Sequence, residues 1–359
     1  MTRNAQRGAA GFAAAYGTLA LGWTLTGHGF PFGRDDARSG ASPLRALAPE
    51  VGAPLFAAVL LGAAVVLLTM SGRAVPPRRA RIALLTYAWA VGAGLLVLLP
   101  DTRLLTLAGY LPILLVGLPF GVLDHVDLAT VFTWTLANQV IAVAGGLLIA
   151  RATARWQFRT AGACAGCGRP AHGPDRTSPE SVARWGRPVT WVAAVIPALY
   201  AVVRLAWAAG IPLGIPRAML AELQASGAVW AGAGLGAFAL AGAVLTLGLV
   251  QRWGEVFPRW MPGLAGRRVP IRLATVPATL VALFVTSAAI GFLTADGFLT
   301  MLTGGVSLAT APMLLWPVWG VALGAATLAY HLRRRPACRD CGRGDPARGL
   351  VHPATADAY

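Results

Sequence analysis

The stretch CAGCGR at residues 164–169 returns near the C-terminus as CRDCGR at residues 338–343. In each copy, two cysteines separated by two residues can converge on one metal ion, and the following glycine lets the backbone turn beneath it. Each copy, called a knuckle below, follows an apolar run that ends in arginines. We interpret the knuckles as halves of one zinc site. Together they hold all four cysteines of the 359-residue chain: Cys164, Cys167, Cys338 and Cys341.

Outside the knuckles, the composition is that of a membrane protein. Hydrophobic residues make up 56% of the chain and charged residues 12%, about half the charged fraction of soluble domains. The mean hydropathy is +0.63. Apolar runs of about 20 residues are long enough to cross the hydrocarbon layer. We therefore predict an all-α integral membrane protein with eight spans, near residues 9–28, 53–70, 82–99, 129–150, 189–209, 227–250, 271–293 and 308–330.

The positions of the 30 basic residues, all arginines, predict which loops face the cytoplasm. With the N-terminus inside, the inner segments carry 24 arginines, the outer loops carry five, and Arg204 lies within a span. Cytoplasmic segments of membrane proteins are enriched in Lys and Arg. Both termini and both knuckles are therefore predicted to be cytoplasmic. The absence of lysine indicates a GC-rich genome, and the pI of 11.3 does not require nucleic-acid binding.

The two halves of the chain match at five points in the same order, which indicates an internal duplication. The matched points are Tyr16 and Trp23 with Tyr200 and Trp207, residues 29–33 with 210–214, 72–76 with 266–270, 128–130 with 308–310, and the two knuckles. Each half holds an even number of spans, so the repeats run in the same sense and bring both knuckles to one face.

The predicted organisation is two parallel four-helix repeats, each followed by a short cytoplasmic segment with its knuckle. The segments are residues 1–160 (first repeat), 161–187 (linker with the first knuckle), 188–332 (second repeat) and 333–359 (tail with the second knuckle). The first apolar run is longer than a signal-peptide core and is expected to be an uncleaved span.

Leu104–Val122 is an uncharged stretch of nineteen residues that could pass for a ninth span. A ninth span would place the arginines of residues 151–188 on the outer face, against the positive-inside rule. We expect instead a re-entrant or interfacial hairpin broken at Pro112 and Pro119, because proline interrupts a straight helix.

The inner loop RWGEVFPRWMP at residues 252–262, followed by GRR at 266–268, interleaves arginine with tryptophan. Tryptophan favours the headgroup layer and arginine the anionic cytoplasmic leaflet. We expect this loop to lie on the membrane and to contact anionic inner-leaflet lipids. Together with RLAWAAGIPLG at 204–214, it resembles a group of multi-pass membrane proteins of high-GC actinobacteria, over residues 190–290 or so. The resemblance implies a bacterial plasma-membrane protein and brings no activity or site residue with it.

The cysteines have three interpretations. Cytosolic thiols stay reduced, so a cytosolic C-x-x-C pair is either metal-binding or redox-active. The glycine after each pair favours structural zinc, with His172 and His352 as weaker ligand candidates. A redox-active dithiol is the main rival, but quinone-linked thiol oxidoreductases of four spans work on the outer face, which the arginine distribution argues against. Thiols without a metal are the third interpretation.

Six polar residues are candidates for a transport or ligand site: Asn138, Gln139, Arg204, Asp124, His125 and Asp127. The first three fall within predicted spans, where burying polar groups in lipid is costly. The others, with Asp101 nearby in sequence, could hold a divalent ion or relay a proton. Each also has a structural explanation: hydrogen bonds between helices for the amides, snorkelling for Arg204, and topology for the outer acids.

The sequence leaves two functions of different class open, and an enzyme has no motif behind it. It contains no phosphate-binding glycine loop with lysine, no H-E-x-x-H and no serine-hydrolase elbow. The first function is a membrane scaffold or sensor, in which zinc fixes the halves and the basic inner surface engages lipid or a cytoplasmic protein. The second is a small-molecule transporter with a site at the repeat interface. A membrane thiol oxidoreductase is third.

Overall fold

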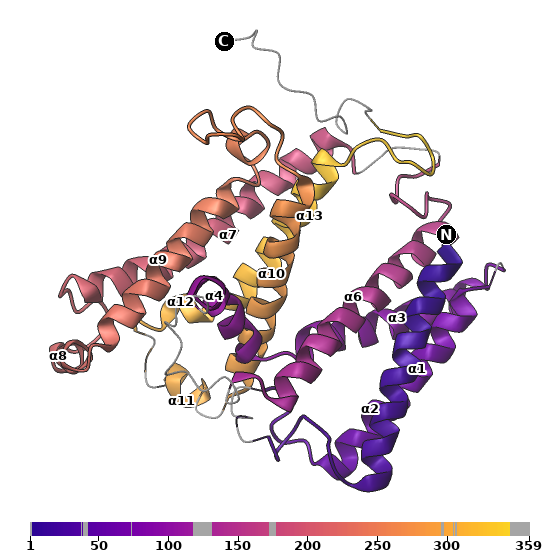
Figure 1. Cartoon of the computed structure of the whole chain (residues 1–359), viewed down its shortest axis with the longest axis horizontal. Coiled ribbons are helices and arrows are strands. Elements are labelled where there is room, and N and C mark those ends of the chain that lie inside the picture. Colours follow the sequence, from indigo (N-terminus) through magenta and orange to yellow (C-terminus); the bar gives the residue numbers. More distant parts are fainter. Residues whose placement is uncertain are drawn as a thin grey trace. The chain divides into compact units, whose positions relative to one another are not determined.

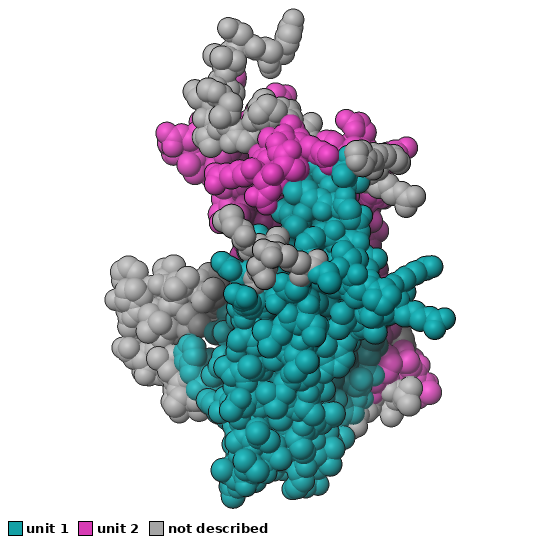
Figure 2. Space-filling view, turned by 90° about the vertical axis from the view of Figure 1, so that its right-hand side faces the viewer, with its two compact units in different colours: residues 1–174, 290–296 teal, residues 175–289, 297–359 magenta. Residues whose placement is uncertain are grey.

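The chain is helical, and the computed structural model contains no strand in the part of the chain that it describes. It describes residues 2–36, 38, 42–72, 74–117, 131–171, 177–295, 298–303, 305 and 307–344. The chain divides into two compact units, residues 1–174 with 290–296 and residues 175–289 with 297–359, which Figure 2 colours separately. The predicted all-α fold is confirmed over the described residues.

The elements follow one another along the chain as labelled in Figure 1. The first unit contains α1 (Thr2–Thr26), α2 (Pro49–Met70), α3 (Arg78–Ala93), the π-helical turn η2 (Gly94–Leu98), α4 (Thr102–Gly117) and α6 (Trp134–Thr160). Then come α7 (Pro179–Ala208), α8 (Arg217–Ala225), α9 (Ala228–Leu247), the 3₁₀ turn η4 (Arg252–Gly254), α10 (Ile271–Thr294), α11 (Phe298–Thr303), α12 (Ala311–Leu314) and α13 (Trp316–Arg334).

Local signals explain where several helices begin. Ser178 caps α7, accepting a hydrogen bond from the backbone N–H of Ser181 (3.3 Å), and is followed by Pro179 and Glu180. Thr133 caps α6 in the same way. A hydroxyl at the N-cap satisfies an otherwise unpaired N–H, and proline suits the first helical position. The fourth predicted span, 129–150, is therefore shifted, because the helix begins at the residue after this cap.

Six helices within the described residues are long and apolar enough to cross a membrane: α2, α3 continued by η2, α6, α7, α9 and α10. The predicted spans 9–28 and 308–330 are not among them. The helix α1 opens with polar residues, and 308–330 is divided between α12 and α13, whose last turn is basic. The chain thus has the helices of a membrane protein, and the count of eight spans stays a prediction.

The predicted break at Pro112 is wrong, because α4 is one helix from Thr102 to Gly117. A proline inside a helix removes one backbone N–H, but its φ is compatible with helical geometry. Pro119 lies outside the described residues, so the second half of the predicted hairpin at Leu104–Val122 is not described. With 16 residues, α4 is shorter than the six candidate spans.

In the first unit, α6 packs closely against α1 and η2, because two adjacent glycines leave space for side chains from these elements. A Cβ on Gly145 would lie 1.8 Å from the ring of Phe12 on α1. A Cβ on Gly146 would lie 2.7 Å from Leu96 in η2. The helices α1 and α2 also pack together, as do α3 and α6. Lipid tails are as apolar as the side chains, so the hydrophobic effect does little to drive helices together in a bilayer. Close van der Waals packing between small residues then contributes much of the attraction between helices.

In the second unit, three pairs of long helices pack together: α7 with α9, α7 with α13, and α10 with α13. The helix α7 contacts α9 and α13. A Cβ on Gly186 of α7 would lie 2.7 Å from the Cβ of Ala329 on α13. A Cβ on Gly320 of α13 would lie 2.2 Å from Oγ1 of Thr286 on α10. In chain order, these three pairs correspond to α1 with α2, α1 with α6, and α3 with α6 in the first unit.

Gly320→Ala is expected to destabilise the protein by about 1–3 kcal/mol, the usual cost of overpacking a tight contact. Its Cβ would also lie 2.9 Å from the backbone N of Thr286 and 3.1 Å from the carbonyl O of Ala282, so backbone must move. The matched control is Gly324→Ala, one turn later, where the nearest atom is 3.8 Å away. The check is the thermal unfolding midpoint in detergent, and equal midpoints would contradict the packing described here.

Candidate metal centre

The first knuckle is a tight turn that begins four residues after the end of α6. The backbone N–H of Cys164 donates to the carbonyl O of Arg169 (3.0 Å), and that of Gly168 donates to the carbonyl O of Cys164 (2.7 Å). Gly168 has a φ of +72°, in the left-handed region that favours glycine. This turn brings Cys164 and Cys167 to the same side of the chain.

The second knuckle has the same backbone bonds at the corresponding positions. It begins four residues after the end of α13. The N–H of Cys338 donates to the carbonyl O of Arg343 (2.9 Å), and that of Gly342 donates to the carbonyl O of Cys338 (2.8 Å). Gly342 has a φ of +69°. The two sequence copies therefore fold into the same turn, as the C-x-x-C-G-R pattern predicts.

The sulfur atoms of Cys164, Cys167, Cys338 and Cys341 all lie within 4.8 Å of one another. A tetrahedron of sulfurs around zinc has edges of about 3.8 Å, from Zn–S bonds of about 2.3 Å. The thiols are half-buried and form no disulfide. These four residues, called the four-cysteine centre below, could hold a metal ion. The predicted clustering of the cysteines is confirmed, while the metal and its identity stay a prediction, and His172 and His352 lie outside the described residues.

An arginine five residues before each knuckle reaches the end of another helix. Arg159 on α6 donates to the carbonyl oxygens of Met70 (3.0 Å) and Gly72 (2.8 Å), where α2 ends. Arg333 on α13 donates to the carbonyl O of Leu249 (2.9 Å), just after α9. The last carbonyls of a helix lack partners within it, so a guanidinium there satisfies them. Each contact holds the helix that carries a knuckle against its neighbour.

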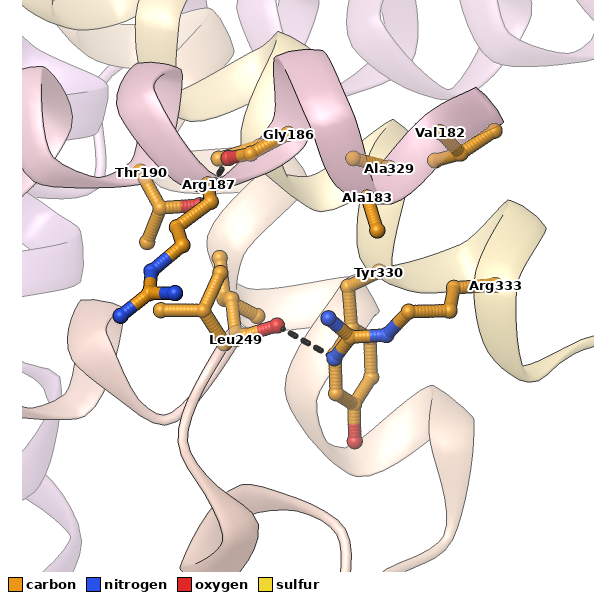
Figure 3. A pocket seen from close by; sticks show the side chains of 11 residues that line it. Val182, Ala183, Gly186, Arg187, Thr190, Leu249, Ala329, Tyr330 and Arg333 are labelled. Carbon is orange, nitrogen blue, oxygen red and sulfur yellow. Dashed lines mark hydrogen bonds between the residues drawn. The ribbon is translucent and has the colours of Figure 1, made fainter. Parts of the chain in front are cut away.

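Figure 3 shows the Arg333 contact at the edge of a shallow pocket between α7, α13 and the chain after α9. Arg187, Thr190 and Tyr330 also line this pocket, whose cavity volume is only about 10 Å³. Pockets for drug-sized ligands usually hold about 300–1,000 Å³. The pocket is therefore too small for such a ligand, and we assign it no substrate.

Asn138 lies in a packed contact between helices. Its side chain is fully buried in the second turn of α6. The hydroxyl of Tyr16 on α1 donates to Oδ1 of Asn138 (3.0 Å), and Nδ2 of Asn138 donates to the carbonyl O of Trp134 (2.9 Å). Both polar ends of the amide are thus satisfied within the protein. The predicted hydrogen bond between helices is confirmed.

Arg204 is held by aromatic rings. Its guanidinium carbon lies 5.1 Å from the ring centroid of Tyr200 and 4.7 Å from that of Trp207 on the same helix. On the other side, a Cβ on Gly236 of α9 would lie 2.9 Å from the Cβ of Arg204. Cation–π contacts stabilise a guanidinium that is partly removed from water. The candidate residues Asp124, His125 and Asp127 lie outside the described residues.

Gln139 belongs to a buried polar cluster that was not predicted from the sequence. Its amide hydrogen-bonds Asp101, whose side chain is 2% exposed. Asp101 also accepts from the backbone N–H of Arg103 (2.8 Å) and forms an ion pair with its guanidinium (3.4 Å). Arg103 pairs with Asp36 as well. Two carboxylates therefore share one guanidinium, and Oε1 of Gln139 is buried without a hydrogen-bond partner among the described residues.

The signal that could have revealed this cluster is the spacing of Asp101 and Arg103 at the start of α4. An aspartate just before a helix commonly caps the N–H two residues later. Burial raises the pKa of the Asp101 carboxyl, while the N–H and charge of Arg103 and the amide of Gln139 oppose the rise. The sequence could suggest the cap, but the contribution of Asp36 depends on the fold.

Gly342→Ala is expected to weaken metal retention by the four-cysteine centre about fivefold to tenfold. Alanine at a φ of +69° costs roughly 1 kcal/mol, which works against the turn that presents Cys338 and Cys341. Gly227→Ala is the matched control, because Gly227 has a φ of +73° and, like Gly342, no atom within 4 Å of an added Cβ. The measurement is zinc loss to a chelator. Equal loss from both variants would mean that the turn does not support metal binding.

Asp101→Asn is expected to remove a pH dependence of stability. Because the pKa of Asp101 is raised in the folded state, its contribution is fully present below the ordinary value of 3.8 and is lost as pH rises through the raised value. Across that window, the unfolding midpoint of the wild type should fall relative to Asp101→Asn, which cannot ionise. Asp35→Asn is the control, since the Asp35 side chain is 67% exposed. Parallel pH profiles for wild type and Asp101→Asn would refute the assignment.

Comparison with known proteins adds no assignment: no protein-family model, no curated protein and no solved structure matches this chain. The resemblance of residues 190–290 to actinobacterial membrane proteins stays a prediction. The chemistry of the centre therefore rests on its own atoms, which are four thiols close enough together to share one ion.

Proposed function

We propose that this protein is a non-enzymatic membrane scaffold or sensor whose four-cysteine centre binds one structural zinc ion. The ion would tie the chain after α6 to the chain after α13. The observation that carries this proposal is the convergence of four sulfur atoms within 4.8 Å. Four thiolates are the ligand set of structural zinc sites, which leave no open position for substrate.

We further propose that the chain spans the plasma membrane of a bacterium eight times, with both termini and the four-cysteine centre in the cytoplasm. The six apolar helices and the distribution of arginines support this arrangement. The helices α1 and α13 would supply the remaining two spans. Reduced cytosolic thiols would then be available to the metal without an oxidant.

An internal duplication accounts for the matching helix ends. Residues 146–169 and 320–343 align without gaps, with nine identities in 24 positions. Trp156 and Tyr330 correspond, and both are fully buried. Arg159 and Arg333 correspond, and both reach carbonyls at a helix end. Equivalent side chains making equivalent contacts support descent from one four-helix unit whose knuckle was retained twice.

Metal analysis of the purified full-length protein tests the proposal. The wild type should contain about one zinc ion per chain, because one four-thiolate site binds one ion. Cys164→Ser and Cys338→Ser should each lose most of it, since removing either pair's first ligand opens the tetrahedron. Cobalt substitution should give the thiolate-to-metal absorption of a four-sulfur site in the wild type alone. Gly227→Ala, distant in sequence from both knuckles, serves as the control and should keep its zinc.

Two outcomes would contradict the proposal. Zinc far below one ion per chain in the wild type would leave the thiols without their metal. Zinc unchanged in Cys338→Ser would mean that the two knuckles do not share one ion. If the metal is absent and the thiols instead cycle between dithiol and disulfide with a quinone, the protein is a thiol oxidoreductase.

A second candidate function, transport of a small solute or ion, is favoured by the buried cluster around Asp101. Asp101 shares the guanidinium of Arg103 with Asp36, and the unpaired buried oxygen of Gln139 is a further acceptor near Asp101, so the cluster has groups that would hold a proton or a cation. Asn138 and Arg204 do not support this candidate, because both are engaged by neighbouring side chains. Proton or cation uptake into proteoliposomes that Asp101→Asn abolishes and Asp35→Asn preserves would favour transport over a scaffold.

A further inference from the structure

The chain between α9 and α10 forms an ordered hairpin, called the 251–270 hairpin below. The N–H of Val269 donates to the carbonyl O of Glu255 (2.9 Å), and the N–H of Phe257 donates to that of Arg267 (2.9 Å). The N–H of Gly266 returns a bond to the carbonyl O of Phe257 (3.0 Å). Figure 1 shows this segment extending past the ends of both helices. The loop is thus an ordered hairpin with a defined tip, and its expected place on the membrane stays a prediction.

The last turn of α13 holds the base of the hairpin. The hydroxyl of Tyr330 donates to the carbonyl O of Gly254 (2.7 Å), and Arg333 forms an ion pair with Glu255 (2.7 Å). Arg334 donates to the carbonyl O of Val269 (2.9 Å). Glu255 is the only acid in residues 251–272, and its charge is already paired. The 251–270 hairpin holds four arginines against this one acid, so it carries a net positive charge.

The hairpin is an insertion that the first half of the chain lacks. The matched segments 72–76 and 266–270 end in Val75-Pro76 and Val269-Pro270. In the first half, Arg159 bonds the carbonyl of Met70, the last residue of α2, which lies five positions before Val75. In the second half, Arg333 bonds the carbonyl of Leu249, just after α9, and Leu249 lies 20 positions before Val269. The additional residues form the hairpin, so the duplicated fold does not need them for its packing.

The tip of the hairpin presents apolar and basic side chains together. Trp260 is 78% exposed, and Leu264, four residues later, is exposed as well. Arg259, Arg267 and Arg268 of the same hairpin are also exposed. An exposed tryptophan on a segment with exposed arginines suits the interface of a bilayer with anionic headgroups, where the indole ring enters the headgroup layer and the guanidinium groups pair with phosphates.

The position of the hairpin in the chain favours lipid over a soluble partner. It starts four residues after α9 and ends directly before α10, and both helices are candidate membrane spans. We propose that the 251–270 hairpin, with Arg259, Trp260 and Arg268, is a binding site for anionic phospholipid headgroups. This site goes beyond the proposed metal-binding scaffold, and it stands whether or not the cysteines hold zinc.

Hydrogen exchange of the full-length protein in nanodiscs tests the charge selectivity. Amides of residues 257–267 should exchange more slowly in discs that contain phosphatidylglycerol than in discs of phosphatidylcholine alone. Each arginine near an anionic surface contributes about a fivefold effect on binding, so Arg259→Gln with Arg268→Gln should erase the difference. Arg217→Gln, also exposed, is the control and should keep it. Equal exchange of the wild type in both discs would overturn the proposal.

A second measurement covers the case in which the double variant does not fold. The fluorescence that Trp260→Phe removes from the wild type reports Trp260 alone among the 12 tryptophans. Brominated phosphatidylglycerol should quench that part of the signal. If it is not quenched, the tip lies away from the bilayer and a protein partner takes the place of lipid. Equal quenching by brominated phosphatidylcholine without phosphatidylglycerol would show contact without selectivity for charge, which also contradicts the proposal.

Discussion

The carbonyl groups at the ends of α2 and α9 need hydrogen-bond donors that their own helices cannot supply, and one arginine from another helix supplies them in each unit. Arg159 reaches Met70 and Gly72, and Arg333 reaches Leu249. A helix leaves its last four carbonyls unpaired, which is costly beside a membrane where water is scarce. Each arginine lies five residues before a cysteine, so the same contact anchors the C-terminal end of the helix that leads into the knuckle. The four-cysteine centre therefore depends on how these helix ends are held.

The two halves share a framework and differ in what they add to it. The first half buries amide and carboxyl groups, with Asn138 bonded to Tyr16 and Gln139 beside Asp101. The second half instead places Arg204 against two aromatic rings and contains the 251–270 hairpin. The helices of both halves approach closely at small residues, so their packing does not depend on which polar side chains lie nearby. The two units can thus keep the same turn at their cysteines while their interiors and their loops differ.

The hairpin and the second knuckle share one support, the last turn of α13. Tyr330, Arg333 and Arg334 hold the base of the hairpin, and the chain then continues to Cys338. A force on the hairpin from the membrane surface would act on the helix that carries two of the four thiols. This gives the sensor version of the proposed function a physical route that uses only contacts within the second unit.

The sequence by itself determined the helical membrane class and the two identical turns at the cysteine motifs. These follow from local composition, from hydrophobic length and from a repeated motif, none of which requires knowledge of distant contacts. It placed a break at Pro112 that α4 does not have, and it separated Gln139 from Asp101 and Asp36. Only the tertiary structure showed that these polar residues lie together and that α13 contacts the base of the hairpin. The physical reason is that each such contact joins residues tens of positions apart, and its energy depends on which helices lie together.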